Sequence, residues 1–159
     1  MNTKFLSLIT ALLLISACSP TKYEYLQLDI EGGFNSSEVQ LAEIVFKNDG
    51  SPLEVEIIKF TNEYHNKKWS HEKIIDGNVK TSWANGNDFD DKYPHQFIFK
   101  LKQMTPIDSV EIYTGTQDGQ KFRLSSFSVY GSQNQEEWIK LVTGKLDKDA
   151  ANAWHSFEI

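Results

Sequence analysis

Hydrophobic and polar residues alternate along eight short runs of the chain, and this pattern predicts strands. The runs cover residues 23–30, 38–46, 54–60, 95–101, 109–114, 122–130, 137–142 and 153–159. In the fourth run Phe97, Phe99 and Leu101 share one face while Gln96 and Lys100 share the other, the period of two of a half-buried strand. Clusters of Gly, Asn and Asp separate several runs, and one helical turn is expected near residues 70–73. The sequence therefore predicts an all-β fold, an antiparallel sandwich or barrel.

The first 18 residues have the pattern of an export signal. Lys4 precedes an apolar run over residues 5–15, which is too short for a permanent membrane span of roughly 20 residues. The segment Ile15-Ser16-Ala17-Cys18 resembles the lipobox of bacterial lipoproteins. That resemblance implies a signal peptide over 1–17 and a lipidated Cys18 with a short linker to residue 22. The remainder, residues 23–159, has the length of one domain. Ser19, rather than Asp, after the cysteine implies sorting to the outer membrane. A plain secretory signal with an incidental cysteine is the alternative.

Composition and charge exclude several classes of function. The 159 residues carry 16 basic and 22 acidic side chains, a net charge of -6, and no basic cluster offsets it, so nucleic acid is a poor partner. A single cysteine excludes an internal disulfide framework and multi-cysteine metal sites. The four histidines lack paired metal-ligand spacing, which argues against zinc. The nucleophile-elbow, phosphate-loop and zinc-protease motifs are absent from the sequence, which indicates a protein that is not an enzyme.

The loop between the third and fourth runs carries a concentration of oxygen donors. Asp76-Gly77-Asn78 places a carboxylate, a flexible glycine and an amide within three residues, and Thr81 adds a hydroxyl. Calcium takes six to eight oxygen ligands, many of them backbone carbonyls, so the loop suits this ion. It is not an EF-hand, because Gly is missing from the sixth position and Glu from the twelfth. A turn closed by its own side-chain hydrogen bonds explains the same residues.

These residues also resemble a known family. Ile75-Asp76-Gly77-Asn78 with Thr81 and Trp83, followed by the 127–132 segment Phe-Ser-Val-Tyr-Gly-Ser and Trp138, resembles the discoidin or coagulation factor five/eight type C domain. The chain is similar to its sugar-binding members, the family 32 carbohydrate-binding modules. The resemblance covers about residues 69–159 and implies a jelly-roll sandwich of about eight strands. Segments typical of the family's closing strands stand first here, at residues 25–28 and 39–46, which implies a circular permutation.

The resemblance also implies the ligands of a structural calcium ion. Carried over to this chain, they are the carboxylates of Asp76 and Glu43, the hydroxyl and carbonyl of Thr81, and the backbone carbonyls of Ala42, Lys73 and Asn78. Two carboxylates from distant parts of the chain are costly to hold together without a cation. The ion would link an N-terminal strand to the central loop.

The ligand surface is expected on loops that hold aromatic and polar residues together. The candidates are Trp83, Asn85, Tyr93 and Asp118, since aromatic rings stack on sugars while amides and carboxylates bind hydroxyls. Ala84 follows Trp83 where galactose-binding members often have His, so simple galactose is not the expected ligand. Trp83 and Tyr93 acting only as packing residues is the alternative. The other tryptophans, Trp69, Trp138 and Trp154, are assigned to the core.

Together these patterns predict a monomeric, membrane-anchored and calcium-stabilised module that binds carbohydrate. Two alternatives remain open at this stage. One is an envelope adaptor that docks a protein partner through the same loops. The other is a small glycan hydrolase, because such enzymes need only two carboxylates, whose separation a sequence does not reveal.

Overall fold

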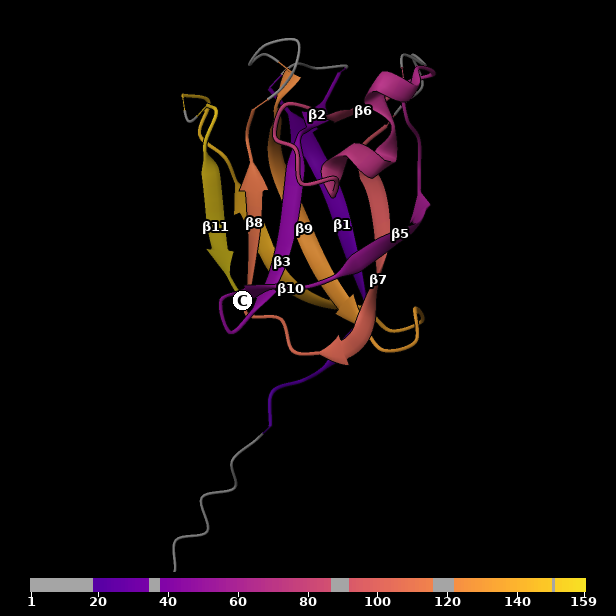
Figure 1. Cartoon of the computed structure of the whole chain (residues 1–159), viewed down its shortest axis with the longest axis vertical. Coiled ribbons are helices and arrows are strands. Elements are labelled where there is room, and N and C mark those ends of the chain that lie inside the picture. Colours follow the sequence, from indigo (N-terminus) through magenta and orange to yellow (C-terminus); the bar gives the residue numbers. More distant parts are fainter. Residues whose placement is uncertain (1–18, 35–37, 87–91, 116–121, 150) are drawn as a thin grey trace, which may run out of the picture.

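Two antiparallel sheets pack against each other in the computed structural model, which describes residues 19–34, 38–86, 92–115, 122–149 and 151–159 (Figure 1). The predictions for residues 1–18, including Cys18, and for Asp118 lie outside these ranges. The strands are β1 (Tyr23–Gly33), β2 (Gln40–Leu41), β3 (Glu43–Asn48), β4 (Ser51–Pro52), β5 (Val55–Phe60), β6 (Trp83–Ala84), β7 (His95–Thr105), β8 (Ser109–Tyr113), β9 (Leu124–Ser132), β10 (Ile139–Lys145) and β11 (Trp154–Glu158). Two short 3₁₀ helices are η1 (Lys67–Trp69) and η2 (His71–Ile74).

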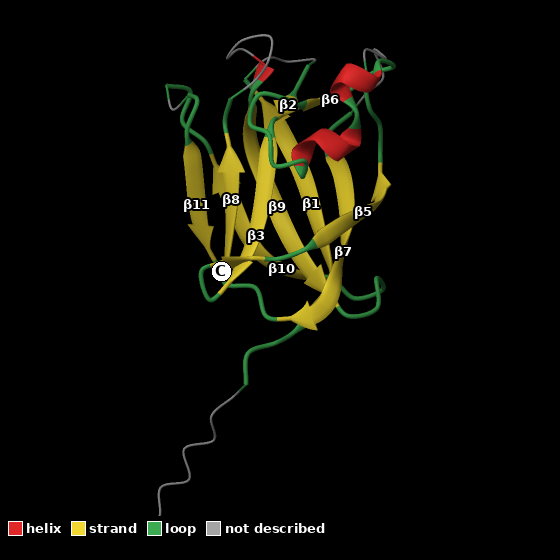
Figure 2. Cartoon of the chain, viewed as in Figure 1, coloured by secondary structure: helices red, strands yellow, loops and turns green. Residues whose placement is uncertain are grey.

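The five-stranded sheet has the order β10-β9-β1-β7-β5, and the four-stranded sheet has the order β11-β8-β3-β4. A short pair, β2-β6, lies beside them at one end of the sandwich (Figure 2). All eight predicted runs form strands, which confirms the all-β sandwich. The predicted helical turn near residues 70–73 is η2, and η1 directly precedes it.

Strand β1 occupies the centre of the five-stranded sheet. Its alternating sequence buries Leu26, Leu28 and Ile30 completely and leaves the residues between them half-exposed. It pairs with β7 on one side and β9 on the other, with Leu28 opposite Phe97 and Val129. Strand β1 is therefore an integral part of the core, since a central strand forms backbone hydrogen bonds with neighbours on both sides.

Aromatic side chains join the two sheets. Phe46 of β3 meets Phe99 of β7 edge to face, with 5.1 Å between ring centroids. Phe127 of β9 meets Phe157 of β11 in the same way at 4.9 Å. Edge-to-face pairs are favourable arrangements of aromatic quadrupoles, so they add to the burial of apolar area.

The strands fix which features lie at which end of the molecule. Residues 19–22 leave the sandwich at the end opposite β2, β6 and the two 3₁₀ helices (Figure 1). Among the described residues, no helix has the length and apolar character needed to cross a membrane.

Candidate metal loop and ligand pocket

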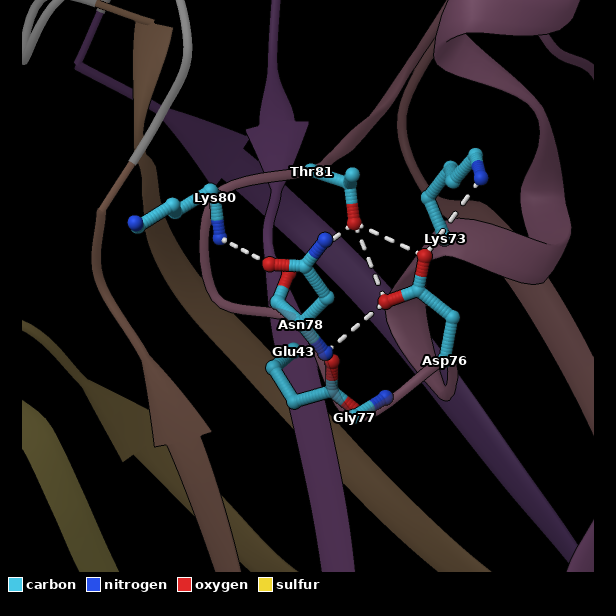
Figure 3. A network of polar contacts seen from close by, with 7 residues as sticks. All are labelled: Glu43, Lys73, Asp76, Gly77, Asn78, Lys80 and Thr81. Carbon is cyan, nitrogen blue, oxygen red and sulfur yellow. Dashed lines mark hydrogen bonds and ion pairs between the residues drawn. The ribbon is translucent and has the colours of Figure 1, made fainter.

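The segment from Asp76 to Thr81 forms a closed turn that follows η2. Gly77 has a φ of 73°, a left-handed conformation that glycine adopts without strain. Asp76 Oδ1 accepts the backbone N–H of Asn78 at 2.9 Å, and the hydroxyl of Thr81 donates to Asp76 Oδ2 at 2.8 Å (Figure 3). The Thr81 hydroxyl also lies 2.9 Å from the carbonyl oxygen of Asn78. The loop thus gathers several oxygens around Asp76, as its sequence predicts.

Glu43 approaches this loop from the outer surface of the four-stranded sheet. Its strand neighbour Ile44 points into the core, so the period of two turns Glu43 outward, beneath the loop. Only 3% of Glu43 is exposed, and its Oε1 accepts the backbone N–H of Gly77 at 3.3 Å. Within the part of the chain that the structure describes, its Oε2 is buried and has no hydrogen-bond partner. A buried carboxylate oxygen without a partner is costly, and it points to a group that completes it.

Electrostatics at Glu43 favour the neutral acid while no cation is bound. Burial raises the pKa of its carboxyl from the ordinary 4.5 to about 7. The N–H of Gly77 lowers the pKa and the neighbouring Asp76 carboxylate raises it. Burial and the nearby negative charge of Asp76 both oppose ionisation of Glu43, as expected for two carboxyl groups in a partly dry site.

Several of the predicted metal residues therefore come together. Ala42 is buried directly before Glu43, and Lys73 lies in η2 with its Nζ 3.4 Å from Asp76 Oδ2. The described residues contain no group of three or more His, Cys, Asp and Glu side chains suited to a metal. Carbonyl and hydroxyl oxygens would have to complete the coordination, which fits calcium and does not fit zinc.

The residues predicted to contact a ligand are more deeply packed than their sequence positions suggest. Trp83 is 0% exposed, its Nε1 donates to the carbonyl of Asn62, and its ring meets Phe97 edge to face at 4.9 Å. The prediction that Trp83 is a sugar platform is wrong, because its ring is part of the core. Tyr93 is half-buried and packs on the ring of His95, 4.8 Å between centroids.

Asn85 has a structural task and also borders a pocket. Its Oδ1 accepts the backbone N–H of Val39 at 2.8 Å, and its own N–H donates to the carbonyl of Val39. A pocket of about 160 Å³ opens beside it, at the end of the sandwich that carries β2 and β6. The residues that line this pocket are Glu38, Gln40, Tyr64, Trp69, Ala84, Asn85 and Phe122. We call it the end pocket.

The walls of the end pocket come from segments that are tied together. Gln40 of β2 pairs with Ala84 of β6, and the N–H of Tyr64 donates to the carbonyl of Ala84 at 2.9 Å. Gln40 is 6% exposed, and its Oε1 is a buried acceptor without a partner among the described residues. Three aromatic residues, Tyr64, Trp69 and Phe122, thus line the end pocket together with Gln40.

Two larger hollows lie along the edge formed by β5 and the end of β7. They measure about 360 and 320 Å³, and both are lined by Glu54, Leu101 and Lys102. Glu54 and Lys102 form an ion pair at 2.5 Å, and neither hollow has an aromatic ring in its lining. Compared with these two hollows, the end pocket is the better place for a specific ligand, since it combines rings with convergent polar groups.

Two further tryptophans differ in their surroundings. Trp69 is buried at the end pocket, with Lys68 Nζ 4.4 Å from its ring centroid. Trp154 is 44% exposed, so its assignment to the core is wrong. Nothing in local alternation could distinguish the inner from the outer face of this last strand.

An antiparallel sandwich with a small aromatic and polar pocket at one end is the architecture of a binding module. The chain belongs to the F5/8 type C domain family, whose model matches residues 57–158. Domains of this family bind carbohydrates or proteins and are typically non-catalytic. No curated protein and no solved structure matches the chain. The family match begins within β5, so β1 and β3 lie outside it; that the family's closing strands come first here stays a prediction.

Proposed function

We propose that this domain binds carbohydrate in the end pocket. The observation that carries the proposal is Gln40, which lines the pocket together with Tyr64, Trp69 and Phe122 and whose buried Oε1 is an acceptor without a partner among the described residues. A sugar ring has an apolar C–H face and a rim of hydroxyl donors. Aromatic rings suit the face, and an amide oxygen accepts from the rim.

The size of the pocket sets the scale of the affinity. About 160 Å³ suits one sugar ring with the rest of the glycan outside. Such a shallow contact buries little area, so we expect dissociation constants on the order of 0.1–1 mM, about -5.5 to -4 kcal/mol. Many copies on one membrane would raise the effective affinity through avidity.

Gln40→Ala and Trp69→Ala should each weaken glycan binding about tenfold or more, because one removes the acceptor and the other an aromatic wall. The measurement is an NMR titration with oligosaccharides of glucose, xylose, galactose and N-acetylglucosamine up to several millimolar. Gln103→Ala is the matched control, since Gln103 is exposed near the end of β7. If no oligosaccharide shifts any resonance, the carbohydrate proposal fails. If binding survives both pocket substitutions, the site assignment fails.

We further propose that a calcium ion stabilises the loop from Asp76 to Thr81. The hydrogen bonds within this loop are also those of a capped turn, so they do not distinguish the alternatives. The support for the ion comes from Glu43, whose buried Oε2 has no partner among the described residues while its Oε1 lies against the loop, so that a bound cation would complete this carboxylate. The carboxylates of Asp76 and Glu43, Thr81, and the carbonyls of Ala42, Lys73 and Asn78 would hold the ion. Calcium would supply a structural link between β3 and the loop.

Finally, we propose that the mature protein is a lipoprotein of the bacterial outer membrane, attached through Cys18. In the structure residues 19–22 leave the end opposite the end pocket, so an anchor there would direct the pocket away from the bilayer (Figure 1). Four extended residues reach about 13 Å, which would keep the domain near the membrane surface.

Radiolabelled palmitate is expected to enter the wild-type protein in cells and to be absent from Cys18→Ala, because the acyl chains need the sulfur and the new amino group of that residue. Ser19→Ala serves as the control that leaves the cysteine in place and should label normally. Equal labelling of wild type and Cys18→Ala would rule out the anchor.

A further inference from the structure

The outer face of the four-stranded sheet carries an exposed aromatic pair far from any role in the core. Trp154 begins the edge strand β11 and lies opposite Tyr113 of β8. The two rings meet edge to face, with 5.4 Å between centroids and 64° between planes. Trp154 remains 44% exposed, the largest exposure of an aromatic side chain among the described hydrophobic residues. Exposing so much of a tryptophan is unfavourable unless something covers it.

The backbone around the pair holds it in place. Thr114 donates its N–H to the carbonyl of Ala153 at 3.0 Å, and its hydroxyl donates to the same oxygen at 3.1 Å. Gly115 makes room for the ring of Tyr113: a Cβ at this position would lie 2.3 Å from Tyr113 Cε1. The aromatic pair is thus preorganised, which lowers the entropy that a ligand must overcome.

The surroundings of the pair are polar. In the next row of the same face, Ser156 lies opposite Glu111, whose Oε1 is 2.7 Å from the Nζ of Lys47. On the far side of Tyr113, its other cross-strand partner Glu43 is covered by the metal loop. Val45 of β3, which is half-buried, lies opposite Glu111 in the same row as Ser156. The exposed aromatic surface is therefore an island two rings wide. A stable protein interface buries about 800 Å² on each partner around an apolar core, which this island does not offer.

We infer that Trp154 and Tyr113 form a second carbohydrate contact, a platform on which one ring of a glycan stacks. The inference rests on the proposed carbohydrate function but uses residues outside the end pocket. A sugar ring fits the island, since its C–H face matches the width of the exposed indole and its hydroxyls reach the polar side chains around it. The chain then has two contacts for glycans, a pocket at its end and an exposed aromatic platform on its side.

The test is an NMR titration of the chain from Ser19 onward, whose described residues form the complete sandwich, with cellohexaose, xylohexaose, laminarihexaose and chitohexaose. The Trp154 indole signal, assigned by its loss in Trp154→Phe, should shift with a glycan that binds. Trp154→Ala should weaken this interaction about tenfold, and Trp154→Phe by no more than about threefold, because a phenyl ring still stacks. Glu158→Ala, on the same strand and face but two rows away from Trp154, is the control for general effects on β11.

The outcomes separate this inference from the proposed function. If a glycan shifts the end pocket, while the Trp154 indole stays unmoved and Trp154→Ala binds as the wild type does, the platform is wrong and the proposed function stands. If Gln40→Ala abolishes the pocket shifts and the Trp154 signal still moves, the platform is an independent site. If none of the four hexasaccharides shifts any signal, the platform is overturned, and the proposed function is overturned with it when the galactose oligosaccharides also leave every signal unmoved.

Discussion

Chelation with EGTA should lower the melting temperature of the protein by roughly 5–10 °C, and excess calcium should restore it. A ligand that binds only the folded state stabilises it by RT ln(1 + [L]/Kd), about 2.7 kcal/mol at a hundredfold excess. In a domain of this size, 1 kcal/mol shifts the melting temperature by roughly 2–4 °C. The physical reason lies at Glu43, where a buried and unpartnered oxygen faces the loop of Asp76.

The response to calcium should disappear in Asp76→Ala and in Glu43→Ala, since each variant lacks one of the two carboxylates. Asp147→Ala is the matched control, because Asp147 accepts the N–H of Asp149 at 2.9 Å in a comparable turn elsewhere. It should respond to calcium as the wild type does. Superimposable melting curves with EGTA and with calcium would show that no exchangeable ion is bound and would leave the loop as a turn capped by Thr81.

Local alternation predicts most of the fold because each strand buries one of its faces. The run around Phe97, Phe99 and Leu101 illustrates this, since all three are buried in β7. The two-residue strands β4 and β6 are too short to show a period, and they follow from the pairing of their neighbours. The central position of β1 depends on partners about 70 and 100 residues away, which no local pattern encodes.

The loop from Asp76 to Thr81 and the candidate ligand residues differ in how far each can be predicted from neighbouring positions in the sequence. Asp76, Asn78 and Thr81 lie within six residues, so their sequence already indicates an oxygen-rich turn. Glu43 lies near these residues only because β3 runs under the loop. In the sequence, only the family resemblance indicates Glu43 as a ligand. The residues of the end pocket are shared among four short segments with no common motif.

Trp83 and Trp154 show why the local sequence does not determine whether an aromatic side chain faces the core or the solvent. Each is next to a loop, where a ring can turn inward or outward. Trp83 turns inward because its indole N–H reaches the carbonyl of Asn62 and its ring meets Phe97. Trp154 turns outward because its neighbour His155 lies opposite the buried Ile112. Long-range contacts decide both cases: the Asn62 carbonyl and the Phe97 ring for Trp83, and the cross-strand register for Trp154.

With EGTA present, the free energy of unfolding is expected to fall as the pH rises from about 5 to about 8. Burial raises the pKa of the Glu43 carboxyl to about 7 in the folded chain, above its ordinary 4.5. Between these values the folded state binds more protons than the unfolded state, so stability decreases with rising pH. Each pKa unit corresponds to about 1.4 kcal/mol, which gives a total loss on the order of 3 kcal/mol.

Urea unfolding at several pH values measures this loss, and Glu43→Gln isolates it from the titration of other groups. The amide of the variant stays neutral at every pH. Asp76, Lys73 and the four histidines are the same in both proteins, so the difference in their free energies of unfolding comes from Glu43. That difference should be small near pH 4.5 and should grow in favour of the variant up to pH 8. Calcium at saturating concentration should remove the loss in the wild type, because the ion stabilises the ionised carboxylate. Parallel pH profiles for wild type and Glu43→Gln in EGTA would show that the buried carboxyl is not the origin of the effect.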